Sequence, residues 1–209
     1  MSPIRGPNRQ PYTLSHLGQL VTPEAVLKSI EAVAPERGLP IIGPKRGVYL
    51  DEAVEEHHPA TILEVGTLVG YSAIRMGRLL KPGQKITCIE VKEEMVQEAR
   101  SNIKNASLSD RIEVLHGDAK KVIPTLKGPF DMLYLDAVKE DYLAYLKLSE
   151  RFLHTGSVVV ADNVKAFATE MADYLDYVRN SGRFRSTYRE APSNWGKDEG
   201  DAIEVSVKL

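Results

Sequence analysis

The stretch TILEVGTLVGYS, residues 61–72, decides the fold. A short apolar run with β-branched residues predicts a strand over residues 61–65, and an apolar helix pattern follows from about residue 71. Gly66 and Gly70 let the backbone turn tightly and approach a ligand, and Ser72 lies near the positive end of the next helix. The glycine spacing is G-x-x-x-G and not the G-x-G-x-x-G of dinucleotide sites. The turn therefore favours a ligand without a pyrophosphate, with a plain strand–helix turn as the alternative.

Strands and helices alternate on the C-terminal side of this stretch. Further strands are predicted over residues 85–89, 111–115, 130–135 and 157–161, and helices near 71–80, 93–105, 119–126, 140–153 and 167–179. Such alternation predicts an α/β fold with a parallel sheet and helices on both faces. Residues 184–189 and 202–207 are predicted as two strands without a helix between them, which favours a terminal antiparallel pair.

The N-terminal part precedes this core. Thr22-Pro23-Glu24 is typical of a helix start, because Thr caps, Pro suits the first position and an acid suits the positive helix end. Residues 40–47 are predicted as a turn-rich loop, and a helix is predicted over about 48–57. Without repeats or a low-complexity linker, we expect one domain over residues 1–209: an N-terminal arm and helices in 1–60 that form part of a substrate cover, and a core in 61–209.

Composition limits the function classes. The 209 residues include 27 Lys and Arg against 29 Asp and Glu, and this balance gives no reason to expect a nucleic-acid partner. No stretch approaches 18 consecutive apolar residues, so we expect neither a signal peptide nor a membrane span. Cys88 is the only cysteine, which excludes a disulfide within the chain and fits a cytoplasmic protein. The oligomeric state is left open.

Glu90 ends the second predicted strand. In parallel sheets ligands bind at the carboxyl ends of strands, where an acid can accept hydrogen bonds from a ribose diol. The alternative is a solvated acid at a helix start, since Glu93 and Glu94 follow closely. Together with the glycine turn, Glu90 favours an adenosine-type ligand.

The fourth and fifth strands each end in oxygen-bearing side chains. Asp136 follows one strand, and Asp162 with Asn163 follows the other. If these strands are neighbours, two carboxylates and an amide converge on one spot, and such an all-oxygen set suits Mg²⁺. No His or Cys accompanies them, so zinc is not expected. Each residue alone could equally cap a helix or form a turn.

Lys139 lies three residues past Asp136, where a loop residue can lean over a metal. A lysine on a loop is usually just solvated. The functional alternative is a general base, because a nearby divalent cation disfavours the ammonium form of a lysine.

At this point the sequence resembles the catechol O-methyltransferase family of class I methyltransferases, from about Gly47 to the C-terminus. The motifs in order are Leu63-Glu64-Val65-Gly66 with Gly70-Tyr71-Ser72, Ile89-Glu90, Leu135-Asp136 with Lys139, Ala161-Asp162-Asn163-Val164, and Asp201-Ala202-Ile203-Glu204. The resemblance implies a Rossmann-like, seven-stranded, mostly parallel sheet and an enzyme that methylates one hydroxyl of a catechol or similar vicinal diol. It also implies S-adenosylmethionine and Mg²⁺ as cofactors and a small-molecule acceptor.

The resemblance also implies roles for individual residues. The donor would be bound by Ile42, Glu64, Gly66, Ser72, Glu90 and Asp136, with Gly66 and Ser72 on its methionine part and Glu90 on its ribose. Asp136, Asp162 and Asn163 would ligate magnesium, and Lys139 would be the base on the reacting hydroxyl. Asn163 and an acid of the last loop, Asp198 or alternatively Glu199, would contact the acceptor.

This chain departs from the family pattern around the acceptor. The loop before Gly43 reads Gly38-Leu39-Pro40-Ile41-Ile42, without the family's aromatic gate and Met. Leu68 replaces a frequent Tyr, Ala137-Val138 replaces a His-Trp pair, and Phe167 stands where a Pro is expected. Two other classes are weighed: a nicotinamide-dependent dehydrogenase, which the missing pyrophosphate motif disfavours, and a non-catalytic methyltransferase-like binding protein, which the retained metal set disfavours.

Overall fold

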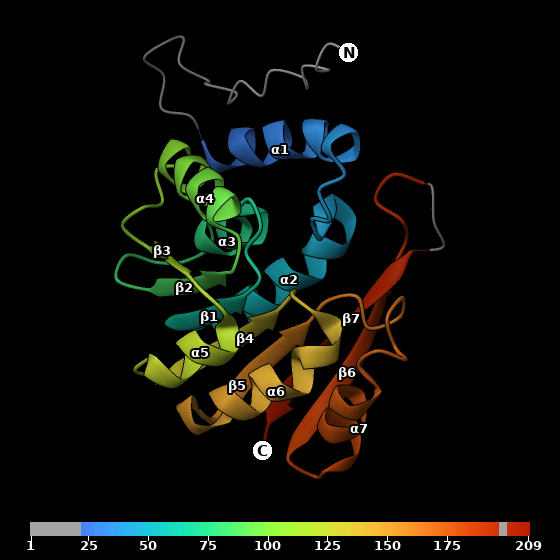
Figure 1. The fold of residues 1–209 in the computed structure, drawn as a ribbon. Coiled ribbons are helices and arrows are strands. Elements are labelled where there is room, and N and C mark those ends of the chain that lie inside the picture. The colour runs from blue at the N-terminus through green and yellow to red at the C-terminus, as the bar shows by residue number, and fades with distance from the viewer. Residues whose placement is uncertain (1–21, 197–199) are drawn as a thin grey trace, which may run out of the picture.

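The computed structural model describes residues 22–196 and 200–209, and its centre is a seven-stranded sheet covered by helices (Figure 1). The strands are β1 (Thr61–Val65), β2 (Lys85–Glu90), β3 (Ile112–His116), β4 (Phe130–Leu135), β5 (Leu153–Ala161), β6 (Phe184–Ala191) and β7 (Asp201–Lys208). The α-helices are α1 (Pro23–Arg37), α2 (Gly43–His57), α3 (Tyr71–Gly77), α4 (Glu93–Asn105), α5 (Ala119–Val122), α6 (Tyr142–Ser149) and α7 (Ala172–Asn180). Three 3₁₀ turns join them: η1 (Ile123–Thr125), η2 (Lys139–Asp141) and η3 (Glu150–Phe152).

The strand order is β3-β2-β1-β4-β5-β7-β6. Strands β1 to β5 pair in parallel, β7 is antiparallel to β5, and β6 is antiparallel to β7. The predicted class I fold, with its mostly parallel sheet and C-terminal antiparallel pair, is confirmed. The order reverses between β1 and β4, so the carboxyl ends of these strands flank the crevice where ligands bind in open α/β sheets.

Alternating strand residues supply two hydrophobic cores. On one face, Ile62 of β1 belongs to a buried cluster with side chains of α1 to α4. On the other face, Leu63 and Val65 belong to a cluster with α5, α6 and α7. Figure 1 shows these helix groups on opposite sides of the sheet. Because both faces are covered at the centre of the sheet, β1 and β4 are mostly apolar, as buried parallel strands require.

Helix α2 begins five residues earlier than predicted, so the loop expected over residues 40–47 is wrong from Gly43 onward. Its cap comes from far along the chain. The Asn194 side chain accepts a hydrogen bond from the Lys45 backbone N–H at 2.9 Å and donates one to the Ile42 carbonyl at 2.8 Å. Asn194 thereby ties the loop after β6 to the start of α2.

Four predicted helices are shorter than expected. Those predicted near 71–80 and 119–126 are α3, which ends at Gly77, and α5, which ends at Val122. The helix predicted over 140–153 is α6 between η2 and η3, and β5 begins at Leu153 instead of residue 157. The helix predicted over 167–179 begins only at Ala172, because the preceding residues form turns in which the Phe167 N–H donates to the Asn163 carbonyl. These turns bring Phe167 close to the carboxyl edge of the sheet.

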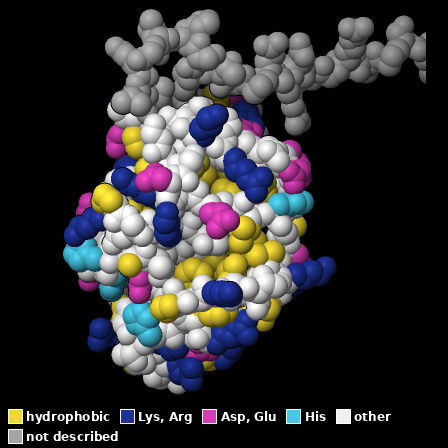
Figure 2. Space-filling model, turned by 90° about the vertical axis from the view of Figure 1, so that its left-hand side faces the viewer, with side chains coloured by type: hydrophobic (Ala, Val, Ile, Leu, Met, Phe, Trp, Pro, Cys, Tyr) yellow, Lys and Arg dark blue, Asp and Glu magenta, His cyan; other side chains and the backbone are white. Residues whose placement is uncertain are grey.

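The surface mixes both signs of charge. Figure 2 shows one face of the molecule, on which Lys, Arg, Asp and Glu are interspersed around a central group of hydrophobic side chains. Among the helices within residues 22–196 and 200–209, none is long and apolar enough to cross a membrane.

Candidate active site

The turn between β1 and α3 lies against the end of β4. Gly66 has φ +90°, and a Cβ at this position would lie 2.2 Å from the Asp136 carbonyl oxygen. The Gly66 N–H also donates to the Ile89 carbonyl at 2.9 Å. Only glycine fits this close approach. The turn is therefore fixed directly above the strand ends, where the sequence predicted a donor-binding loop.

Glu64 lies beneath this turn and is fully buried. Its carboxylate accepts hydrogen bonds from the Thr67 hydroxyl at 2.5 Å and from the Ser72 hydroxyl. Burial raises the pKa of Glu64 to about 7, although these hydroxyls and Cys88 lower it. Glu64 thus orients the two hydroxyls that face the turn, and its charge varies near neutral pH.

Glu90 holds the other side of the turn. Its carboxylate accepts from the Leu68 backbone N–H and from the Lys92 backbone N–H, both at 2.9 Å. The side chain borders the cavity and is 8% exposed. A carboxylate has about four lone-pair sites, so Glu90 retains capacity to accept hydrogen bonds from a diol.

A cavity of about 640 Å³ runs along the carboxyl edge of the sheet. Its lining includes Ile42, Gly66, Ser72, Glu90, Asp136 and Lys139. This volume lies within the usual range of small-molecule sites, about 300–1,000 Å³. A smaller hollow of about 170 Å³, between the end of α2 and the loop before β2, lies away from these strand ends and holds none of the predicted site residues.

Asp136 and Asp162 are neighbours at this edge. Leu135 of β4 pairs with Ala161 of β5, and the Asp162 N–H donates to the Leu135 carbonyl at 3.0 Å. Burial and the negative charge of Asp136 raise the pKa of Asp162 to about 6, against the opposing effect of Arg46. The predicted convergence of the two strand-end carboxylates is therefore present.

Asn163 is oriented by Asp201. The Asn163 amide nitrogen donates to Asp201 at 2.7 Å, and a carboxylate at this position can only accept, which fixes which end of the amide is nitrogen. Asp201 also accepts from the backbone N–H groups of Lys165 and Ala166. The Asn163 amide oxygen is thereby turned away from Asp201. The sequence assigned Asp201 only to the last strand, so this positioning role was missed.

Lys139 lies beside Asp136, as its position three residues later predicted. Its ammonium donates to the Asp136 carboxylate and to the Tyr142 hydroxyl, both at 2.9 Å. Tyr142 in turn donates to the Asp162 carbonyl at 3.3 Å, and burial raises the pKa of Tyr142 well above its usual range. The lysine nitrogen also lies 5.9 Å from the centre of the Phe167 ring. These contacts hold the Lys139 nitrogen beside Asp136 and close to Asp162.

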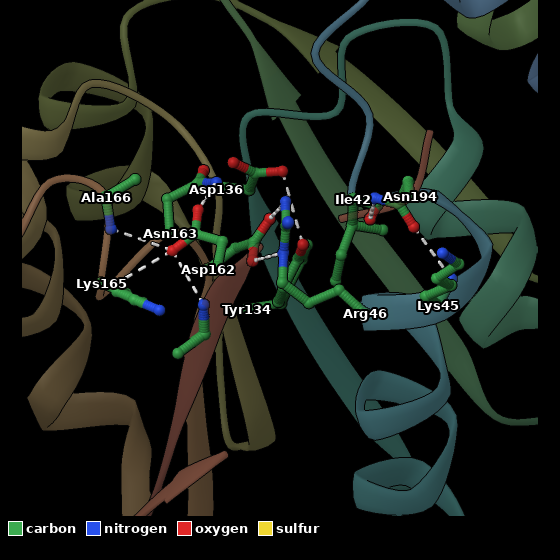
Figure 3. Close-up of polar contacts among 12 residues, drawn as sticks. Ile42, Lys45, Arg46, Tyr134, Asp136, Asp162, Asn163, Lys165, Ala166 and Asn194 are labelled. Atoms are coloured by element: carbon green, nitrogen blue, oxygen red, sulfur yellow. Dashed lines mark hydrogen bonds and ion pairs between the residues drawn. The ribbon is translucent and has the colours of Figure 1, made fainter. Parts of the chain in front are cut away.

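Arg46, from the first turns of α2, was not predicted to belong to the site. Its guanidinium donates to both Asp162 oxygens, from Nε at 2.5 Å and from Nη2 at 2.9 Å (Figure 3). Burial alone would lower the pKa of Arg46, but Asp162 raises it above its ordinary value. A basic residue near a helix N-terminus opposes the helix dipole, and this was the available signal that Arg46 has an anionic partner.

The remaining predicted residues divide into two groups. Ile42 is buried, precedes α2 and lines the cavity. Asp198 and its alternative Glu199 lie outside the described residues. Val138 is 55% and Phe167 40% exposed, and both line the cavity, so apolar side chains border part of its opening.

A model of the O-methyltransferase family matches residues 24–180. The chain belongs to this family. It is 34% identical to catechol O-methyltransferase B of Danio rerio over 195 residues, covering 90% of this chain and 73% of that protein. It is 33% identical to catechol O-methyltransferase of Mycobacterium tuberculosis over 148 residues, covering 69% of this chain and 67% of that protein.

Solved O-methyltransferase structures have the same fold as this chain. The O-methyltransferase from Bacillus cereus in complex with SAH superposes with a TM-score of 0.78 at 26% identity, covering 88% of this chain and 91% of that one. The predicted family and enzyme class are confirmed, and the family match decides against the dehydrogenase alternative.

Proposed function

We propose that this O-methyltransferase transfers the methyl group of S-adenosylmethionine to one hydroxyl of a catechol-type vicinal diol, with a divalent cation such as Mg²⁺ at the acceptor. The observation that carries the proposal is one continuous cavity, which is lined by the Gly66 turn and Glu90 as well as by Asp136, Lys139 and Asn163. The names of the relatives, catechol O-methyltransferases, and the SAH bound to the Bacillus cereus structure support the same donor and acceptor.

The donor end of the cavity suits an adenosine-type ligand. Glu90, at the end of β2, can accept hydrogen bonds from the ribose diol. The methionine part would lie beside Gly66 and the Ser72 hydroxyl, both of which line the cavity. A donor bound in this way would lie next to Asp136, which lines the same cavity.

The acceptor end suits a hard cation. Within the described residues, no group of three or more His, Cys, Asp or Glu side chains could hold a metal, but the proposed set has only two acids and an amide. Asp136, Asp162 and the oriented amide oxygen of Asn163 are the oxygen donors that Mg²⁺ prefers. A bound cation would stabilise the anionic form of an acceptor oxygen and fix the orientation of two adjacent ones.

Lys139 is proposed as the base. As the neutral amine, its nitrogen would accept the proton of the reacting hydroxyl, while an oxygen lone pair forms the new bond to the methyl carbon. The carbon–sulfur bond breaks at the same time, and its electron pair stays on the sulfur of S-adenosylhomocysteine. Asp136 and Tyr142 hold the lysine nitrogen in place for this transfer. Much of the acceleration should come from holding oxygen and methyl carbon about 3–3.5 Å apart.

Acceptor geometry tests this function. Transfer of a labelled methyl group should be measured to catechol, to its 1,3-diol isomer resorcinol and to phenol, at saturating donor and Mg²⁺. We expect methylation of catechol and little of the other two, because only adjacent oxygens can share one cation. Equal turnover of phenol would contradict the vicinal-diol requirement. Tight S-adenosylhomocysteine binding without transfer to any diol would favour the non-catalytic alternative.

A further inference from the structure

Arg46 lines the cavity and pairs with Asp162, which is buried behind it and is not a lining residue. The two hydrogen bonds form a fork in which each donor takes a different carboxylate oxygen. The side chains of Arg46 and Asp162 are 10% and 1% exposed. A forked, charge-assisted pair in a buried setting is among the stronger polar contacts in proteins. Arg46 also borders the cavity itself, so it is part of the site and not only of the surrounding shell.

This contact conflicts with a second role of the same carboxylate. A divalent cation bound by Asp162 needs at least one of the oxygens to which Arg46 now donates. The guanidinium and the cation also carry like charge and would share one carboxylate at short range. Lys139 likewise forms an ion pair with Asp136, through one carboxylate oxygen. Each acid of the proposed cation site therefore already has a cationic side chain beside it.

The structure gives Arg46 a place to move. Its side chain adjoins a cavity of about 640 Å³, and its backbone lies at the start of α2 next to Gly47. The start of α2 is itself held by Asn194, so the side chain can leave Asp162 without loss of the helix cap. Asp201, whose charge also raises the pKa of Arg46, is a second acid in its vicinity.

We propose that Arg46 competes with the divalent cation for Asp162, and that cation binding is coupled to withdrawal of the guanidinium from at least one carboxylate oxygen. The inference rests on the proposed function in that it assumes a cation at Asp136 and Asp162. Arg46 then sets the concentration range in which the site fills: it lowers cation affinity and keeps the acid pair neutralised when the cation is scarce.

Cation affinity tests the competition without any methyl transfer. Mn²⁺ binding to the full chain should be titrated by the electron paramagnetic resonance signal of free Mn²⁺, for wild type, Arg46→Met, Arg46→Lys and Lys45→Met. Lys45→Met is the matched control, because it removes the same charge from the neighbouring residue, whose ammonium donates to the Ser193 carbonyl at 2.6 Å.

We expect Arg46→Met to bind Mn²⁺ about tenfold tighter or more, since a hydrogen-bonded charged pair contributes roughly 1.5–3 kcal/mol. The Mn²⁺ affinity of Arg46→Lys, which keeps the charge but not the forked hydrogen bonds, should fall between those of wild type and Arg46→Met. The Mn²⁺ affinity of Lys45→Met should stay within about twofold of wild type, because exposed charges contribute little. Thermal unfolding with and without Mn²⁺ should show a larger stabilisation of Arg46→Met than of wild type, which also verifies that the variant is folded.

Each other outcome overturns the inference in a recognisable way. Equal or weaker Mn²⁺ binding by folded Arg46→Met, with wild type still binding, shows that Arg46 positions Asp162 or plays no part, and leaves the proposed function intact. An equal gain in Lys45→Met assigns the effect to general charge and not to competition. No Mn²⁺ binding by any of the four proteins overturns both the competition and the cation in the proposed function.

Discussion

Replacing Glu64 by Gln should change how stability depends on pH. In the folded chain burial raises the pKa of Glu64 to about 7, from an ordinary value near 4.5. Between these two values the folded state binds more protons than the unfolded state, so this residue makes stability fall as pH rises. Its stabilising contribution is fully present below about pH 4.5 and is lost as pH rises through about 7. The shift corresponds to about 3 kcal/mol over this range.

The assay is urea unfolding of wild type and Glu64→Gln at several pH values between about 5 and 8. Because Gln does not titrate, the free energy of unfolding of the variant minus that of wild type should increase by up to about 3 kcal/mol from the acid to the alkaline end. Asp162, whose pKa is raised to about 6, titrates in both proteins and largely cancels in this difference. The absolute offset also contains the cost of re-pairing the Thr67 and Ser72 hydroxyls with an amide.

Glu113→Gln is the matched control. Glu113 is an exposed residue of β3, so the same substitution should not reproduce the pH-dependent gain. A stability difference for Glu64→Gln that stays flat across this range would refute the argument that burial holds a proton on Glu64.

Three further outcomes are expected. Lys139→Met should lower kcat by roughly 10²–10⁴-fold while S-adenosylhomocysteine binding by calorimetry stays near wild type; a loss of only a few-fold would remove the base assignment. Glu90→Ala should weaken S-adenosylhomocysteine about tenfold or more, as expected for hydrogen bonds to a charged acceptor, and unchanged binding would take Glu90 out of the ribose site. Gly66→Ala should destabilise the fold by about 1–3 kcal/mol more than Gly83→Ala, seen as a melting temperature several degrees lower. Gly83 shares the left-handed φ, +91° against +90°, but has no atom within 4 Å of an added Cβ, so equal losses would show that the contact with Asp136 costs nothing.

The parts of the fold that depend on local pattern could be predicted from the sequence. The apolar runs in β1, β2, β4 and the second half of β5 are largely buried, and this burial makes them apolar and recognisable. The sequence predicted that Asp136 and Asp162 meet if their strands are neighbours, because parallel strands end at one edge, and the structure shows that β4 and β5 are neighbours. The position of Lys139 beside Asp136 could be predicted because the two residues are three apart, a distance that a single turn can bridge.

What could not be predicted depends on contacts between distant parts of the chain. The start of α2 is capped by Asn194, 149 residues after Lys45, so no local signal marks it. The Arg46–Asp162 pair spans 116 residues and joins a helix start to a strand end. Asn163 and Asp201 are likewise 38 residues apart. Such pairs are decided by tertiary packing, and a single sequence without related sequences beside it does not reveal which of its charged residues meet. The assignment of Asp198 or Glu199 to the acceptor stays a prediction.

Methyl transfer with and without the cation tests the central claim most directly. The chain should be dialysed against EDTA and assayed with labelled S-adenosylmethionine and catechol, first in EDTA and then with Mg²⁺ in excess. Asp162→Ala should be assayed beside it, with S-adenosylhomocysteine binding as the measure of an intact donor site. The proposal predicts methylated catechol only in the Mg²⁺-restored wild type. Full transfer by wild type in excess EDTA, or by Asp162→Ala with Mg²⁺, would contradict a cation-bound diol at Asp136, Asp162 and Asn163.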